Sequence, residues 1–122
     1  MNKPLLSPHF GRSEFACKCG CGFDTVDTEL LRILENIRGY FDKPVYITSA
    51  CRCIAHNEAE GGTNNSQHLK GRAADVIVKG VEPDDVAAFL ETILLHGGVG
   101  RYSTFTHVDC RTNDYVAGWS GA

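Results

Sequence analysis

The sequence predicts a single α+β domain over residues 1–122, with a small, mainly antiparallel sheet and flanking helices. Residues 27–41 repeat apolar side chains at helical spacing, whereas residues 44–49 and 73–78 are short runs rich in β-branched side chains. These segments follow one another without the regular alternation that builds a parallel sheet. A chain of 122 residues also leaves no room for a second independent core.

Two helices are predicted. The apolar face of the first consists of Leu30, Leu34, Ile37 and Phe41. Asp27 is suited to cap its N-terminus, and Gly39 and Pro44 bracket its end. The second helix begins at Pro83, a residue favoured in the first turn, and runs to about Leu95 before Gly97-Gly98.

Four strands are predicted, at residues 44–49, 73–78, near 99–103 and at 105–111. The opening segment to Phe23 is rich in Gly and Cys, and we expect it to be irregular with one turn of helix near Ser13–Phe15. Residues 54–67 predict a short helical turn and then a long loop. The chain closes on a Gly-rich tail that contains Trp119.

Composition excludes some classes of function. The net charge of −3 gives no basic footprint for nucleic acid. Residues 1–15 lack the apolar run of a signal peptide, and no stretch approaches the ~20 apolar residues of a membrane span. We therefore expect a monomer synthesised in the cytoplasm, without a signal peptide, a membrane span or a nucleic-acid partner.

The strongest local pattern runs from Ser66 to Asp75, with the sequence SQHLKGRAAD. His68 ends a polar loop and Asp75 lies just inside a predicted strand. Gly71 permits a tight turn that would bring the loop back over the strand end. A nitrogen ligand and an oxygen ligand would then face a common point.

A second pattern lies at residues 105–109, where strand alternation places Phe105, His107 and Asp109 on one face. His107 would add a second imidazole to His68 and Asp75. Three protein ligands leave one position of a zinc ion open, as in catalytic sites, and the ion can then acidify a water molecule and polarise a carbonyl. Spacing alone leaves ordinary roles open, since most histidines are surface or core residues and an Asp early in a strand often anchors a loop. Those ordinary roles are the default for His9, His56 and His96.

The pattern Ser-x-His-x-x-Gly-x-Ala-x-Asp, followed downstream by His-x-Asp, resembles the M15 metallopeptidases, the group of D-Ala-D-Ala carboxypeptidases and L-alanyl-D-glutamate endopeptidases. Every fixed position of the first motif is matched, by Ser66, His68, Gly71, Ala73 and Asp75. Four further segments are similar to a short, often phage-encoded branch of that family, namely residues 13–17, 47–52, 98–102 and 107–111. The resemblance covers roughly residues 9 to 119.

This resemblance implies a zinc peptidase of peptidoglycan stem peptides or cross-bridges, with the fold of the hedgehog signalling domain. It implies a Zn²⁺ ion held by His68, Asp75 and His107. Arg52 falls where the family carries an Arg that meets a substrate carboxylate, a pairing in which the guanidinium forks onto both oxygens. The alternative for Arg52 is a surface ion pair. A phage origin would explain delivery to the cell wall by a holin or in a virion.

The general base is the point at which this sequence departs from the family. Many members place Glu or Asp three residues before the last zinc ligand, where this chain has Thr104, and others place His where it has Phe105. Asp109 is the first candidate base, but a carboxylate there can instead orient the imidazole of His107. His56 and Tyr102 are weaker candidates for proton transfer or oxyanion binding.

Because of Thr104, two other hypotheses stay open. One is a zinc-containing module that binds cell-wall peptide or docks in a phage particle without cutting. The other is a Cys-rich interaction domain with a structural metal, which the open position left by three ligands argues against.

Six cysteines are many for a chain of this length. Cys17, Cys19 and Cys21 form a Cys-x-Cys-x-Cys run, Cys51 and Cys53 form a second pair, and Cys110 follows the His-x-Asp motif. The spacing is not the usual Cys-x-x-Cys of a zinc site. Disulfides, a second structural metal and free buried thiols all remain open, with a stabilising role favoured. The two Cys-x-Cys segments flank the helix at 27–41, so a link between them would tie the N-terminal segment to the loop that carries Arg52.

Overall fold

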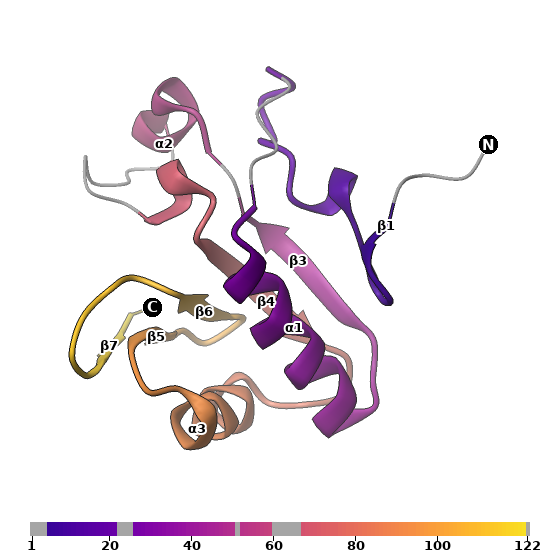
Figure 1. Ribbon diagram of the computed structural model, residues 1–122, viewed down its shortest axis with the longest axis vertical. Helices are drawn as coiled ribbons and strands as arrows, with labels where there is room; N and C mark the ends of the chain where they lie inside the picture. The colour runs from indigo at the N-terminus through magenta and orange to yellow at the C-terminus, as the bar shows by residue number, and fades with distance from the viewer. Residues whose placement is uncertain (1–4, 22–25, 51, 60–66, 122) are drawn as a thin grey trace.

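The computed structural model describes residues 5–21, 26–50, 52–59 and 67–121. Its strands are β1 (Leu5–Ser7), β2 (Phe10–Gly11), β3 (Val45–Ser49), β4 (Ala73–Val78), β5 (Gly97–Arg101), β6 (Thr106–Asp109) and β7 (Val116–Ser120). Its helices are α1 (Thr28–Phe41), α2 (Ile54–Ala59) and α3 (Pro83–Ile93), with 3-10 turns η1 (Arg12–Glu14) and η2 (Gln67–Lys70). The α+β fold class is confirmed (Figure 1).

The main sheet has five strands in the order β3-β4-β6-β5-β7. Every pair in it is antiparallel except β5 and β7, which run parallel. Helices α1 and α3 pack on one face of this sheet (Figure 1). The opposite face is therefore left for other groups, and it carries the polar residues described below.

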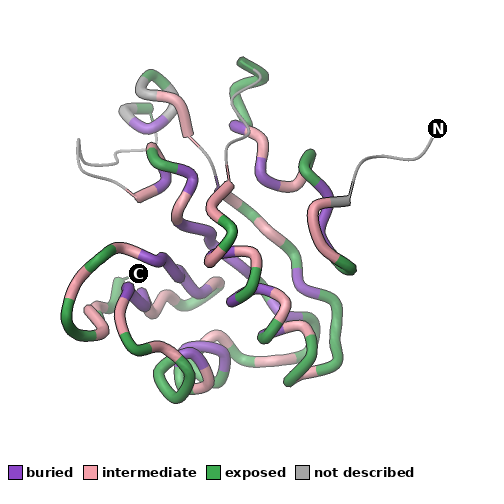
Figure 2. The backbone as a smooth tube through the Cα atoms, viewed as in Figure 1, coloured by how far each residue is buried: buried purple, intermediate pink, exposed green. Residues whose placement is uncertain are grey.

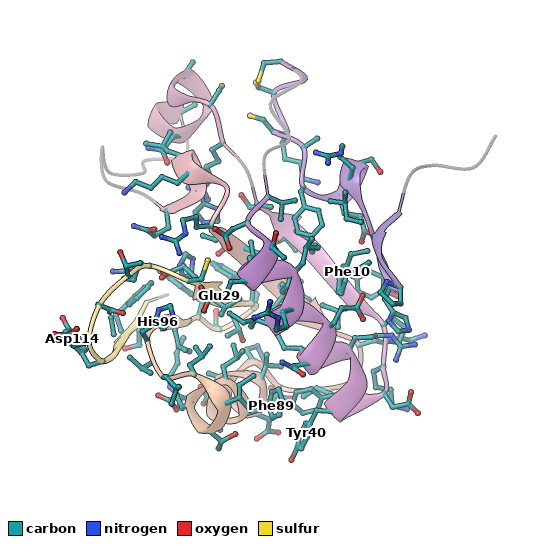
Figure 3. The ribbon with its side chains drawn as sticks, in the orientation of Figure 1. Phe10, Glu29, Tyr40, Phe89, His96 and Asp114 are labelled. Carbon is teal, nitrogen blue, oxygen red and sulfur yellow. The ribbon has the colours of Figure 1, made fainter. Side chains whose placement is uncertain are left out.

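The hydrophobic core lies between the sheet and the two helices. Its members include Leu30, Leu34 and Ile37 of α1, Val86 and Leu90 of α3, and Val76, Val99 and Val108 of the sheet. Figure 2 shows that the buried residues lie mainly in the central strands and on the inner sides of these helices. Tyr40 and Phe89 stack at the outer edge of the α1–α3 contact, with ring centroids 4.1 Å apart (Figure 3).

Helix α1 has the ends that its sequence predicts. The Asp27 side chain accepts a hydrogen bond of 2.8 Å from the backbone N–H of Glu29, which satisfies a donor at the helix N-terminus. Asp42 adopts a left-handed backbone, with φ of 51°, and ends the helix after Phe41. Helix α3 ends at Ile93 rather than near Leu95, because Leu94 is extended and turns the chain toward β5.

Two elements differ from the sequence prediction. Residues 5–11 form a short hairpin of β1 and β2, where an irregular segment was expected. The turn of helix expected near Ser13–Phe15 is present as η1. The Gly-rich tail forms β7, which adds to the sheet edge by parallel pairing with β5. Both were missed because their strands are short and depend on partners that local sequence does not reveal. The loop at 60–66 and Phe23 lie outside the described residues.

Glu35 of α1 binds the N-terminal hairpin through hydrogen bonds. Its carboxylate accepts hydrogen bonds from the Ser7 hydroxyl at 2.6 Å and from the His9 backbone N–H at 2.8 Å. The other carboxylate oxygen lies 2.6 Å from Nδ1 of His9. Although burial acts to raise the pKa of Glu35, the hydrogen bonds from Ser7 and His9 lower it below its ordinary value.

We expect Glu35→Gln to lower the free energy of unfolding by about 1–2 kcal/mol near neutral pH, because it removes charge-assisted hydrogen bonds. A carboxyl whose pKa is depressed by folding stabilises the protein above its unfolded pKa of about 4.3, and this stabilisation is lost as the pH falls through the folded value. The difference between wild type and variant should therefore shrink in acid. Urea unfolding of both proteins between neutral pH and acid measures this difference, and Glu82→Gln at an exposed position is the control.

Candidate metal centre

The three residues proposed as metal ligands meet on the open face of the sheet. Asp75 of β4 and His107 of β6 are direct cross-strand partners. The same row continues to Ser49 on one side and to Gly100 and then Trp119 on the other. Because opposite residues of paired strands project to one face, the row sets a carboxylate beside an imidazole.

His68 reaches this row from η2. The turn ends at Gly71, whose φ of 66° is left-handed and whose N–H donates to the carbonyl of His68 at 3.3 Å. The His68 carbonyl also accepts from the N–H of Arg52 at 3.0 Å, which joins the turn to the segment after β3. The tight turn expected at Gly71 is present, and it returns the chain directly into β4. Ser66 of the same motif lies outside the described residues.

Hydrogen bonds fix which nitrogen of each imidazole faces Asp75. Nδ1 of His68 lies 2.6 Å from the Ala50 carbonyl, which can only accept, so this nitrogen carries the proton. Nε2 of His68 is then an acceptor, and it lies 3.5 Å from Oδ1 of Asp75. On His107, Nε2 lies 2.8 Å from Oδ2 of Asp109, and Nδ1 lies 2.9 Å from Oδ1 of Asp75. Two imidazole nitrogens therefore converge on one carboxylate, an arrangement that a bound cation would stabilise.

The charges of the cluster favour a cation in the same place. Burial acts to raise the pKa of Asp75, but the interactions with His107 and His68 outweigh it and bring that pKa below its usual range. Burial lowers the pKa of His107, whereas Asp109 and Asp75 raise it more strongly. Asp75 is thus an anion at neutral pH, and its neighbourhood attracts positive charge.

The donor set fits zinc. A tetrahedral ion with bonds of about 2.1 Å separates its ligand atoms by about 3.4 Å, close to the 3.5 Å between His68 and Asp75. One donor atom from each of His68, Asp75 and His107 lies within 4.8 Å of the others. The three side chains keep 5, 10 and 11% of their surface exposed, so the cluster is enclosed and still open to solvent on one side. Two imidazoles and one carboxylate match the ligand set of catalytic zinc sites.

Asp109 lies beside the cluster on the same face as His107, as strand alternation predicts. It is fully buried, and Arg111 binds both of its oxygens, through Nε to Oδ1 at 2.8 Å and Nη2 to Oδ2 at 2.6 Å. Burial raises the pKa of Asp109, but the hydrogen bonds from Arg111 and His107 lower it well below its ordinary value. These contacts favour the orienting role over the role of base, since a general base needs an oxygen free to take a proton.

Arg111 was not identified from the sequence. Side chains two residues apart on a strand lie on the same face, so Arg111 follows His107 and Asp109 on that face. This spacing could have identified Arg111 from the sequence. Its guanidinium also lies over the Trp119 ring, 5.0 Å from the centroid.

Arg52 lies at the edge of the cluster. Its Nη2 is 3.6 Å from Oδ2 of Asp75, its Nε donates to the Ser49 hydroxyl at 3.1 Å, and its Nη1 donates to Asn57 at 3.5 Å. A guanidinium has five N–H donors, so these three contacts leave capacity for a ligand carboxylate. The position matches the carboxylate-binding role implied by the resemblance, and the pairing partner is a site residue rather than a surface residue.

Trp119 packs against the cluster on the side of β5. Its ring centroid lies 5.0 Å from that of His107, and its Nε1 donates to the Tyr102 hydroxyl at 2.9 Å. Gly100 separates the two strands at this point, and a Cβ there would lie 2.7 Å from Nε1 of Trp119. Glycine is required because the indole occupies the space that a side chain would take.

We expect Gly100→Val to displace the Trp119 indole, because the added methyl groups occupy the same volume. Overpacking of this kind lowers the free energy of unfolding by roughly 1–3 kcal/mol. A shift of the residues beside His107 should also weaken metal binding by the candidate ligands by on the order of 10-fold, since the groups packed around a ligand imidazole set its orientation. Gly118→Ala is the matched control, because a Cβ at Gly118 meets no atom within 4 Å. Unchanged indole fluorescence and metal affinity in Gly100→Val would contradict this role of Trp119.

The other candidates for proton transfer are less well placed. Thr104 is exposed in the turn between β5 and β6, and Phe105 stacks on Tyr102 with ring centroids 4.4 Å apart. The Tyr102 hydroxyl accepts from Trp119, so its own hydrogen remains available to donate. The side chain of His56 lies outside the described part of the chain.

His9 and His96 lie away from the cluster. His96 contacts Glu29, with Nε2 2.9 Å from Oε2, and its Nδ1 lies 2.8 Å from the Arg111 carbonyl (Figure 3). His9 pairs with Glu35 of the hairpin anchor. Among the described residues, no helix is both long and apolar enough to cross a bilayer.

A comparison with protein families matches residues 8–109 to the family described as Peptidase M15. This match covers the greater part of the chain, including His68, Asp75, His107 and Asp109. The chain belongs to the peptidase M15 family. The resemblance drawn from the His and Asp motifs is therefore confirmed. M15 peptidases are metallopeptidases, and the cluster of His68, Asp75 and His107 gives this M15 chain a group able to hold a metal ion.

One curated relative of this M15 chain is the "Probable peptidoglycan L,D-endopeptidase MepK" of Haemophilus influenzae. The two are 36% identical over 66 residues, which is 52% of this chain and 35% of the relative. The matched region thus spans about a third of the length of that protein.

Proposed function

We propose that this chain is a zinc-dependent peptidase that hydrolyses a peptide bond in bacterial peptidoglycan. The observation that carries the proposal is the convergence of His68 Nε2 and His107 Nδ1 on the Asp75 carboxylate, with the outer nitrogen of each imidazole already engaged. Membership of the peptidase M15 family supports the peptidase activity, and the name of the Haemophilus relative supports the choice of peptidoglycan.

His68, Asp75 and His107 would hold the zinc ion, each through one atom. When bound, zinc supplies Lewis acidity, which lowers the pKa of water and polarises a peptide carbonyl. Asp109 holds the His107 ring so that Nδ1 points inward, and Arg111 keeps Asp109 ionised and fixed. Trp119 covers one side of the imidazole and limits access of water from that direction.

Arg52 would position the substrate. Its unused N–H donors lie beside Asp75, so a carboxylate bound there would place the neighbouring peptide bond next to the proposed metal ion. Stem peptides of peptidoglycan carry free carboxylates near their peptide bonds. Whether the bond cut is terminal or internal then depends on which of these carboxylates Arg52 selects.

The test is digestion of purified peptidoglycan, with mass spectrometry of the soluble products. We expect new peptide termini with the zinc-loaded protein, none after treatment with chelator, and recovery when zinc is added back. Release of single D-Ala residues would indicate a carboxypeptidase, and release of larger peptide or muropeptide fragments would indicate an endopeptidase. Absence of any new termini across the pH range in which the protein is folded would contradict the proposal.

A second candidate is a non-catalytic module that binds cell-wall peptide. Two observations favour it: Arg111 and His107 engage both oxygens of Asp109, and Thr104 stands at the usual acidic position. This candidate predicts zinc-dependent sedimentation with peptidoglycan and no new termini. The digestion assay, run with a sedimentation assay on the same samples, separates the two candidates.

A further inference from the structure

Four cysteines from two segments bring their sulfur atoms together. Cys17, Cys19 and Cys21 lie in the loop after η1, and Cys53 lies between β3 and α2. All four Sγ atoms lie within 4.8 Å of one another. These segments meet at one end of the molecule (Figure 1), where sulfur atoms are visible in Figure 3.

The spacing of the sulfur atoms is that of a tetrahedral metal site. Sγ of Cys17 lies 3.4 Å from that of Cys19 and 3.8 Å from that of Cys53, and the Cys19–Cys53 distance is 3.6 Å. Four thiolates around a zinc ion with bonds of about 2.3 Å are separated by about 3.8 Å. A disulfide would require about 2.05 Å, and all five cysteines that the structure describes are free.

The backbone of both segments supports this grouping. Gly20 has a left-handed φ of 84° and donates its N–H to the Cys17 carbonyl at 3.2 Å, which forms the turn that leads to Cys21. The N–H of Cys53 points at Sγ of Cys17, 3.4 Å away. A backbone donor aimed at a sulfur atom stabilises a thiolate, the form in which cysteine binds metal.

We propose that Cys17, Cys19, Cys21 and Cys53 form a structural zinc site, separate from the centre at His68, Asp75 and His107. Four protein thiolates close the coordination of the ion, so this site has no open position for substrate or water. Of the three alternatives that the sequence leaves open for the cysteines, the geometry favours the second structural metal. The inference does not rest on the proposed peptidase function.

The position of the site gives it a role. Residues 17–21 belong to the N-terminal segment, whereas Cys53 directly follows Arg52, whose guanidinium lies 3.6 Å from Asp75. A metal ion shared by the two segments would tie the N-terminal loop to the backbone that carries Arg52. If the proposed function is right, loss of this ion should raise KM more than it lowers kcat, because Arg52 meets substrate rather than the reacting atoms.

The experiment counts zinc in the full chain, purified under reducing conditions without chelator, by inductively coupled plasma mass spectrometry. We expect two equivalents per chain for the wild type, one for Cys19→Ser and one for His68→Ala. The double variant should hold none. Cys110→Ser is the matched control, since Cys110 lies outside the cluster, and it should keep two. Cys19 is exposed, so its replacement leaves the hydrophobic core intact.

A second measurement needs no variant. Titration of the wild type with a mercurial reagent that attacks thiolates should release one equivalent of zinc, and Co²⁺ in the same site should show thiolate-to-metal charge-transfer absorption. No thiol-linked zinc, or a native mass lower by two hydrogens for each cysteine pair, would overturn the inference. Because His68→Ala should still retain the thiolate-bound ion, failure of this site and failure of the peptidase proposal are distinguishable.

Discussion

Replacing His68 with Ala is expected to remove one equivalent of zinc and to lower hydrolysis of peptidoglycan by on the order of 10³-fold. The reason is geometric, because Nε2 of His68 is one of the three donor atoms that converge in the proposed centre among the described residues. A metal ion in a peptidase stabilises developing charge by several kcal/mol, and each 1.36 kcal/mol corresponds to tenfold in rate. Zinc content by mass spectrometry and the rate of release of new peptide termini measure both effects.

The matched control for His68→Ala is His9→Ala. His9 is half exposed, pairs with Glu35 and lies away from the centre, so its loss should leave zinc content and activity unchanged. Circular dichroism is needed for both variants, because the buried His68 side chain also donates to the Ala50 carbonyl through Nδ1 and the variant loses this bond. A folded His68→Ala protein that kept full activity would rule out His68 as a ligand in the catalytic centre.

The sequence anticipated the parts of the site that depend on local pattern. Strand alternation correctly placed Asp109 on the face of His107, and Gly71 correctly marked the tight turn between His68 and β4. That Asp75 and His107 are direct cross-strand partners is not a local property. The resemblance to the M15 family implied that they share a metal ion, but it did not give this register. Register between strands depends on the whole sheet, so spacing alone could not supply it.

The parts that the sequence did not reveal depend on pairing over long distances. The segment Val116–Ser120 contains three small residues, so its sequence does not predict a strand. Parallel pairing with β5 nevertheless makes it one and places Trp119 in the row of His107. The need for glycine at position 100 could not be predicted either. It arises because Trp119 packs against Gly100, and this contact depends on the pairing of β5 with β7. The sulfur cluster likewise joins residues 17–21 to Cys53, with helix α1 and strand β3 between them.

The difference between the two roles of Asp109 can be measured with Asp109→Asn. In the orienting role, the carboxylate accepts from Nε2 of His107 and from Arg111 at the same time. An amide offers one acceptor oxygen and one donor group, so one of these N–H partners must face a donor. The imidazole then loses its orientation and basicity, and we expect zinc affinity to fall by about 10–100-fold, as for other carboxylates that support a metal-binding histidine.

If Asp109 is instead the general base, Asp109→Asn should keep its zinc, lose kcat at every zinc concentration and lose the acidic limb of the pH profile. In the orienting role, excess zinc should restore part of the activity, because the variant is limited by occupancy of the metal site. Competition with a chelator gives the affinity, and turnover at saturating zinc gives the rate. Asp114→Asn removes an equal charge from an exposed position in the loop between β6 and β7 and serves as control (Figure 3). The buried pairing of Asp109 with Arg111 makes restored activity the expected result.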